Sequence, residues 1–254
     1  MYRLEREEFV RFPFVFLWIL LAFQAGFINA FGFLACGRYV SHVTGFGTQI
    51  GVALAQKKPF FALELVGFPV FFILGSFVSG LITAARIESG RRPRFDLVTV
   101  ILPVLILLLF ILGHRGAFGP FGEDLIQARD FFLLFLLSFI CGMQNSCFAV
   151  LTKGQIRTTH LTGISTDIGT DLARTFFGNL GPIELELTKR TNTSRIVTFV
   201  FFAIGSVFSV HVSQYLEHLA LVVPLLTSLI VLVGVQMISR KLDRKYNPQM
   251  SARE

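Results

Sequence analysis

The sequence predicts an all-α integral membrane protein, in which six transmembrane helices and two re-entrant half-helices form a 3+3 inverted internal repeat. Three observations support this fold class. The chain is strongly apolar, several apolar runs are long enough to cross a bilayer as helices, and two polar motifs each occur twice at nearly the same spacing. The third observation sets the domain organisation, because internal repeats have to be recognised before a fold is assigned.

Composition excludes an ordinary soluble domain. Of the 254 residues, 53% are hydrophobic, 30 are phenylalanine, and the mean hydropathy is +0.67. Only 15% are charged, whereas soluble proteins average about 25%. A protein of this length could not hide so much apolar surface from water, so we expect the lipid bilayer to be its surroundings.

Charge and cysteine content exclude further classes. The formal charge is +7, and we attribute it to basic loops on the cytoplasmic side of a membrane. No stripe of basic and aromatic residues indicates nucleic-acid binding. The three cysteines show no paired spacing for a disulfide framework or a zinc site. We therefore expect no metal and no cofactor.

The repeated motifs divide the chain in two. Gly-x-x-Asn occurs at 26–29 and 142–145, an offset of 116 residues, and His-x-Thr-Gly-x-x-Thr-x-Ile-Gly occurs at 42–51 and 160–169, an offset of 118. One insertion of two residues reconciles the offsets, which indicates an internal duplication. The first repeat is predicted to cover 1–118 and the second 128–254.

Each repeat is predicted to contain three spans. A charged stretch precedes the first apolar run, but that run is longer than the apolar core of a secretory signal and is assigned as a span. The polar segment 181–195 is predicted to be a loop. The six predicted spans are 13–36, 59–85, 96–114, 130–151, 195–214 and 219–239.

A half-helix is predicted after each His-x-Thr-Gly motif, over 44–56 and 162–178. The first is about 20 Å long at 1.5 Å per residue, too short for a hydrocarbon core of about 30 Å. If both are re-entrant, 18 Lys and Arg residues lie inside and 5 outside, against 16 and 7 for eight crossings. The positive-inside rule therefore favours six spans, with both termini cytoplasmic. An odd number of spans per repeat inverts the second half.

Candidate binding residues come from the repeated motifs. Asn29 and Asn145 lie at equivalent places in two predicted spans, where each amide needs a partner. They could join neighbouring helices or line a shared polar cavity. At the start of each half-helix, free backbone N–H groups and the helix dipole favour an anion; a purely structural cap is the alternative. The residues at these two starts are His42, Thr44, Gly45, His160, Thr162 and Gly163.

Asp167, Asp171 and Arg174 distinguish the second half-helix from the first. Ionisable groups at membrane depth are functional candidates, so they are the candidate ion-coupling residues, and Asp167 is also a candidate for solute binding. The alternative is an internal ion pair, because residues three or four positions apart share a helix face.

The two motifs, with Arg157, Thr158 and Thr159 directly before the second, resemble the YoaK-like family of bacterial inner-membrane proteins. The resemblance covers residues 14 to 239. It implies six spans and a bacterial inner-membrane location, and it brings no known substrate. Members often carry Asp where this chain has Asn29, and Asn where it has Phe46.

The leading expectation is a secondary transporter or permease for a small polar or anionic solute, bound between the two repeats. The first alternative is a non-transporting membrane module that binds a lipid or a protein partner. An intramembrane enzyme is a weaker alternative, because the sequence shows no catalytic motif, and we expect no enzymatic activity. The sequence is compatible with a homo-oligomer and does not specify one.

Overall fold

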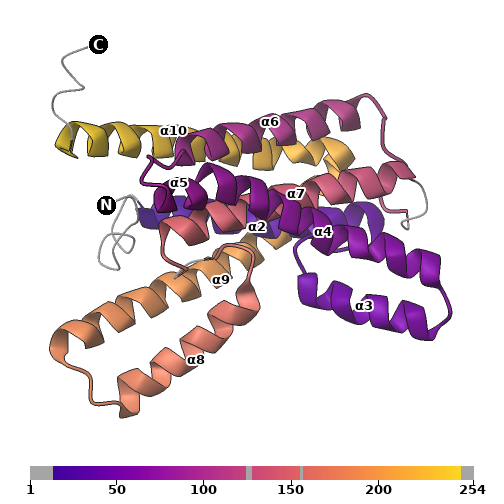
Figure 1. Ribbon diagram of the computed structural model, residues 1–254. Helices are drawn as coiled ribbons and strands as arrows, with labels where there is room; N and C mark the ends of the chain where they lie inside the picture. Colours follow the sequence, from indigo (N-terminus) through magenta and orange to yellow (C-terminus); the bar gives the residue numbers. More distant parts are fainter. Residues whose placement is uncertain (1–13, 124–127, 155–156, 247–254) are drawn as a thin grey trace.

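The structure, a computed structural model, describes residues 14–123, 128–154 and 157–246, and every regular element in them is a helix (Figure 1). The two ends of the chain, which the sequence analysis places in the cytoplasm, lie outside the described residues. The elements are α2 (Phe14–Cys36), α3 (Val43–Ala55), α4 (Pro59–Ile82), α5 (Ala84–Glu88), α6 (Phe95–His114), α7 (Ala128–Leu151), α8 (Leu161–Phe177), α9 (Pro182–Leu216), the 3-10 helix η1 (Glu217–Leu221) and α10 (Val222–Tyr246).

Five stretches of the described residues are long and apolar enough to cross a membrane, which makes this a multi-pass membrane protein. Four of them correspond to predicted spans within a few residues. The fifth, Pro182–Met237, is 56 residues long and contains α9, η1 and most of α10. A single straight helix of that length would measure about 84 Å, but the chain reverses direction at η1 (Figure 1).

Six helices form the bundle: α2, α4, α6, α7, α9 and α10. In it α2 packs on α9, α4 packs on α7, and α6 packs on α10. Figure 1 shows that α2 begins and α10 ends at the same end of the bundle, where α5 also lies. The large, fully buried side chains of the core include Trp18, Phe31 and Phe148.

Two of these helix pairs cross through glycines. A Cβ at Gly26 of α2 would overlap the carbonyl oxygen of Phe202 in α9, and one at Gly205 would overlap that of Phe23. Ser206 donates a hydrogen bond to the Gly26 carbonyl, at 3.1 Å. The backbones of α2 and α9 therefore touch, which is how helices pack closely where lipid supplies no hydrophobic driving force.

The crossing of α4 and α7 is built in the same way. A Cβ at Gly75 would overlap the Phe139 carbonyl oxygen, and one at Gly142 would overlap that of Phe72. Ser76 donates to the Gly142 carbonyl at 3.0 Å. Each crossing thus consists of two reciprocal glycine contacts and one serine hydrogen bond.

Two helical hairpins branch from the bundle. The helix α3 packs on α4, and α8 packs on α9. In Figure 1, α3 points toward one end of the bundle and α8 toward the other. The observed α3 and α8 match the two predicted half-helices to within one residue at each end.

One prediction was wrong. Residues 181–195, predicted as a loop, form a helical extension of the apolar part of α9, with Gly181 as N-cap and Pro182 in the first turn. Proline is favoured there because the first helical N–H groups have no partner within the helix. The polar side chains of this extension are partly buried against α8, so a partner helix stabilises a segment whose composition resembles a loop. Those buried include Thr188, Thr191, Asn192 and Arg195.

Candidate functional site

The segment between α2 and α3 folds back along α2. The amide oxygen of Asn29 accepts hydrogen bonds from the backbone N–H of Val40, at 3.2 Å, and of Ser41, at 3.1 Å. It also accepts one from the Ser41 hydroxyl at 2.9 Å. The carbonyl of Val40 accepts a hydrogen bond from Ser138 of α7. Since Asn29 lies seven residues before the end of α2 at Cys36, the chain returns about 10 Å into the bundle before α3 starts.

The segment before α8 returns by a similar amount. Asn145 accepts a hydrogen bond from the backbone N–H of Thr159 at 3.4 Å. Its neighbour Gln144 donates to the hydroxyl of Thr158 at 3.0 Å. Both asparagines therefore hold a returning loop, with Asn145 six residues before the end of α7 at Leu151.

A buried chain of amides links the two halves. Gln24 donates to the amide oxygen of Gln144 at 3.0 Å and accepts from the hydroxyls of Thr227 and Ser228 in α10. Gln144 also donates to the carbonyl of Leu21 at 3.1 Å. Because a buried polar group costs free energy unless it is bonded, this chain fixes α2, α7 and α10 relative to one another.

Each histidine lies over the glycine three residues later. A Cβ at Gly45 would lie 2.6 Å from Nδ1 of His42, and a Cβ at Gly163 would lie 2.8 Å from Nδ1 of His160. A side chain at either glycine would therefore displace the imidazole ring, which packs at the N-terminus of the short helix. His160 Nδ1 also lies 3.5 Å from Nη1 of Arg157.

The starts of α3 and α8 keep their backbone donors available. His42 and His160 occupy the N-cap positions, and neither helix has a side-chain cap hydrogen bond. Both histidines are exposed, as are Thr44 and Thr162 in the first turns. Each start thus combines N–H groups that no side chain caps, a hydroxyl and an imidazole, which is a chemistry suited to an anion.

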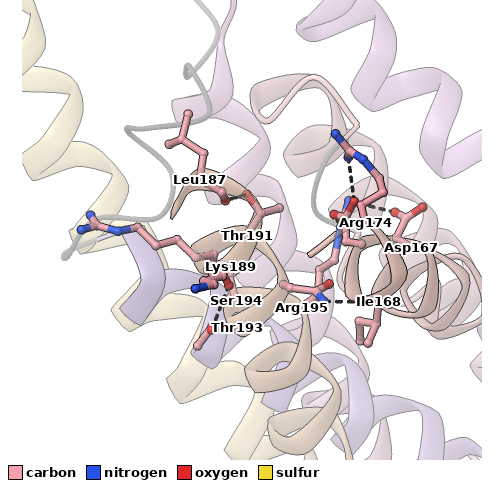
Figure 2. A network of polar contacts seen from close by, with 12 residues as sticks. Asp167, Ile168, Arg174, Leu187, Lys189, Thr191, Thr193, Ser194 and Arg195 are labelled. Atoms are coloured by element: carbon pink, nitrogen blue, oxygen red, sulfur yellow. Dashed lines mark hydrogen bonds and ion pairs between the residues drawn. The ribbon is translucent and has the colours of Figure 1, made fainter. Parts of the chain in front are cut away.

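The acidic residues of α8 belong to an ion-pair network with α9 (Figure 2). Arg195 contacts Asp171 at 2.7 Å and Asp167 at 3.1 Å. Arg174 contacts Asp171 at 2.9 Å and Glu184 at 3.5 Å. The side chains of Arg195 and Asp171 are only 7% and 10% exposed, whereas Asp167 is 51% exposed. The network joins α8 to α9. Ion pairing within the protein was the alternative to an ion-coupling role for Asp167, Asp171 and Arg174.

The comparisons with known proteins identify a family and supply no activity. The model of a family described as a protein of unknown function, DUF1275, matches residues 17–234. The chain belongs to the DUF1275 family. Neither a curated protein nor a solved structure matches it. The DUF1275 match begins in α2, ends in α10 and includes both hairpins, so the returning loops and the Arg195 network lie within the family region.

Two residues of the DUF1275 region escaped the sequence analysis. Arg195 was counted as a basic residue of a loop, and Asn192 was not considered. Asn192 donates to the carbonyl of Ile168 at 3.2 Å. The signal that could have found Arg195 is the charge pattern, since Asp167 and Asp171 share one face of a helix and a buried carboxylate needs a cation nearby. No comparable signal marks Asn192.

The structure groups the predicted site residues in two ways. At each half-helix start, histidine, threonine and glycine come together with the asparagine that holds the preceding loop. Asp167, Asp171 and Arg174 form a separate group with Arg195. Within residues 14–123, 128–154 and 157–246, no group of three or more His, Cys, Asp or Glu residues could hold a metal ion.

Proposed function

We propose that this protein is a secondary transporter or permease of the bacterial inner membrane that takes a small polar or anionic solute. Its proposed architecture is an inverted duplication with six spans, two re-entrant half-helices and both termini in the cytoplasm. The observation that carries the proposal is that the loop before each half-helix returns about 10 Å along the bundle, and that each half-helix starts with an exposed histidine and threonine and no side-chain cap. The likeness to YoaK-like proteins is part of the same proposal.

The two glycine crossings support the duplication. Gly142 follows Gly26 by 116 residues, the offset of the Asn motif, and Phe139 follows Phe23 by the same number. In the partner helices, Gly205 follows Gly75 by 130 residues. The serines beside these two glycines have the same offset and make the same hydrogen bond. Equivalent residues thus make equivalent contacts in both crossings.

Helix direction supports six crossings and the inversion. In Figure 1 the six bundle helices alternate in direction, and α2 and α7, which carry the equivalent asparagines, run oppositely. The hairpins that follow them point to opposite ends. Half-helix N-termini directed at a solute near the midplane are a recurring feature of transporters with inverted repeats.

The crossings also limit how such a transporter could move. Each of them joins a helix of the first half to a helix of the second, α2 to α9 and α7 to α4. The halves are therefore interleaved, and one cannot rock against the other without opening two close backbone contacts. The short helices α3 and α8 each pack on one partner helix, α4 and α9 respectively, so we place the gating movement in α3 and α8.

Accessibility in membranes tests the proposal. In a background without the native cysteines, single cysteines at Gln56 and Ala117 should label from outside, and cysteines at Ser89 and Lys189 from the cytoplasm. All four positions are exposed. If instead Gln56 and Ser89 exchange sides, the half-helices cross the membrane and the midplane site is lost.

The site itself is tested at Thr44 and Thr162. Cysteines there should react with a small anionic thiosulfonate, faster than with its trimethylammonium analogue, because the helix N-terminus attracts negative charge. A lipid-facing cysteine at Val207, which is 58% exposed, is the matched control and should react with neither. Failure of both threonine positions from both sides of the membrane would remove the proposed pathway.

A second candidate, a non-transporting module that binds a lipid or a protein partner, is favoured by one observation. The amides of Asn29 and Asn145 are occupied by the returning loops, so they need no solute to explain them. This alternative predicts that cysteines at Thr44 and Thr162 stay unreactive while the six-span labelling pattern is retained.

A further inference from the structure

The tip of the α8–α9 hairpin carries three exposed apolar side chains. Phe176 and Phe177 end α8, and Ile183 lies in the first turn of α9. Their exposed fractions are 73%, 91% and 77%. A turn between two helices usually faces water and is polar, so a cluster of this kind marks a contact with something apolar.

Helix lengths show where this tip would lie if α9 were perpendicular to the membrane. The apolar part of α9, residues 196–216, is about 31 Å long and fits a hydrocarbon core of about 30 Å. Arg195 then lies at the boundary of the core. Asp171, which it contacts, shares that level, and Phe177 and Ile183 would lie about 9 Å and 18 Å farther out. The headgroup layer is only about 5–8 Å thick on each side.

A perpendicular hairpin would therefore expose its three apolar side chains to water. Figure 1 shows a different geometry, in which the α8–α9 hairpin leans away from the axis of the bundle. Leaning brings the tip back toward the plane of the interface. The part of α9 within the predicted core also carries exposed apolar side chains, such as Ile196, Phe199 and Val200, which are 44%, 43% and 46% exposed.

Charge argues against recognition of a particular lipid headgroup. The hairpin between 161 and 195 contains four acidic and four basic side chains. Several of these are paired within it, as Arg190 is with Glu186 at 2.7 Å. Because these charges sum to zero, the hairpin has no net electrostatic attraction to anionic lipid. Its apolar tip is then the part that would contact the membrane.

We propose that the tip formed by Phe176, Phe177 and Ile183 is an interfacial anchor that inserts into the headgroup region of the bilayer and holds the α8–α9 hairpin against the membrane surface. The occupant of this apolar surface is phospholipid, independent of headgroup charge. Because Asp171 and Arg195 clamp α8 to α9, the anchor also sets the tilt of α8 and the position of His160 at its start. The inference does not depend on transport.

A tryptophan reporter tests the anchor. The sole tryptophan, Trp18, is replaced in the variant Trp18→Phe, and Phe177→Trp is added to the full chain in proteoliposomes of phosphatidylcholine. We expect blue-shifted emission, strong quenching by lipids brominated near the headgroup, weaker quenching by lipids brominated near the chain ends, and little quenching by aqueous iodide. Addition of anionic lipid or of salt should leave the quenching unchanged.

Matched controls define the contrary outcomes. Val207→Trp should be quenched best by deep bromines, and Ser89→Trp, in the exposed loop after α5, by iodide. Iodide quenching of Phe177→Trp without bromolipid quenching would put the tip in water and overturn the inference. Protection from both quenchers would show that protein covers the tip, which overturns it equally. Ile183→Trp repeats the test at an independent position if Phe177→Trp does not fold.

Discussion

The contact between Asp171 of α8 and Arg195 of α9 leads to a quantitative prediction. In the other hairpin, α3 packs on α4 with apolar residues at the corresponding positions. With the offsets of the proposed duplication, Asp171 corresponds to Ala53 and Arg195 to Leu65. Ala53 and Leu65 are both buried, at 3% and 0% exposure. The double variant Asp171→Ala/Arg195→Leu therefore gives the second hairpin the pair of residues that the first already contains.

The two single variants should cost more than the double. Arg195→Leu leaves Asp171 buried with only Arg174, and removing one partner of a buried ion pair costs about 3–5 kcal/mol. Asp171→Ala leaves Arg195 with the half-exposed Asp167 and removes a charged hydrogen bond worth about 1.5–3 kcal/mol. The double variant leaves no unpaired charge at the Asp171 position, and apolar replacement of a whole buried pair is often neutral. We expect it to cost less than about 1.5 kcal/mol.

Unfolding in mixed micelles, followed by circular dichroism, measures these free energies. Hydrogen exchange of α8 adds a local readout, which should speed up in Arg195→Leu and recover in the double variant. Glu186→Ala/Arg190→Leu is the control, since that pair is more than half exposed and exposed pairs contribute about 0–1 kcal/mol. Additive losses, with the double variant within about 0.5 kcal/mol of the sum, would refute the reasoning.

Three further predictions follow from the packing. Gly142→Ala should separate α4 from α7 and destabilise the protein by about 1–3 kcal/mol or more, whereas Gly80→Ala, at a position where an added Cβ meets nothing within 4 Å, should be neutral or stabilising in the same unfolding assay. Gln144→Leu should cost about 1–3 kcal/mol, since it leaves the buried amide of Gln24 without its acceptor; a smaller loss would mean that the amide chain is dispensable. The three native thiols should resist a water-soluble maleimide until the protein unfolds, and rapid labelling of the folded protein would contradict the burial of Cys36, Cys141 and Cys147.

The long apolar helices and the bounds of the two short helices α3 and α8 could be predicted from the sequence. Apolar run length and helix start signals act locally, and the repeated His-x-Thr-Gly motif marks the first residues of α3 and α8. The N-terminal part of α9 could not be predicted in the same way. A polar stretch can be a loop in water or a helix against another polar helix, and only the partner decides between them.

The site was partly predictable for a related reason. The motif residues at the two half-helix starts were identified because they repeat. The separate roles of these residues could not be predicted from the sequence. Asn29 and Asn145 bind the backbone of loops that fold back toward them only in the folded protein. Arg195 was missed because its partners lie 24 residues or more before it. A glycine such as Gly26 indicates close packing, but the sequence does not say that Phe202 is its neighbour.

The interleaved crossings have a consequence for biogenesis. The helix α2 is complete at Cys36. The backbone that Gly26 contacts, around Phe202 of α9, is synthesised 166 residues later. At roughly 5–20 residues per second, α2 waits on the order of 10 to 30 s in the membrane before its partner exists. The first three spans therefore cannot mature as an independent unit. A chain that ends before α9 would leave the glycine face of α2 without its partner backbone.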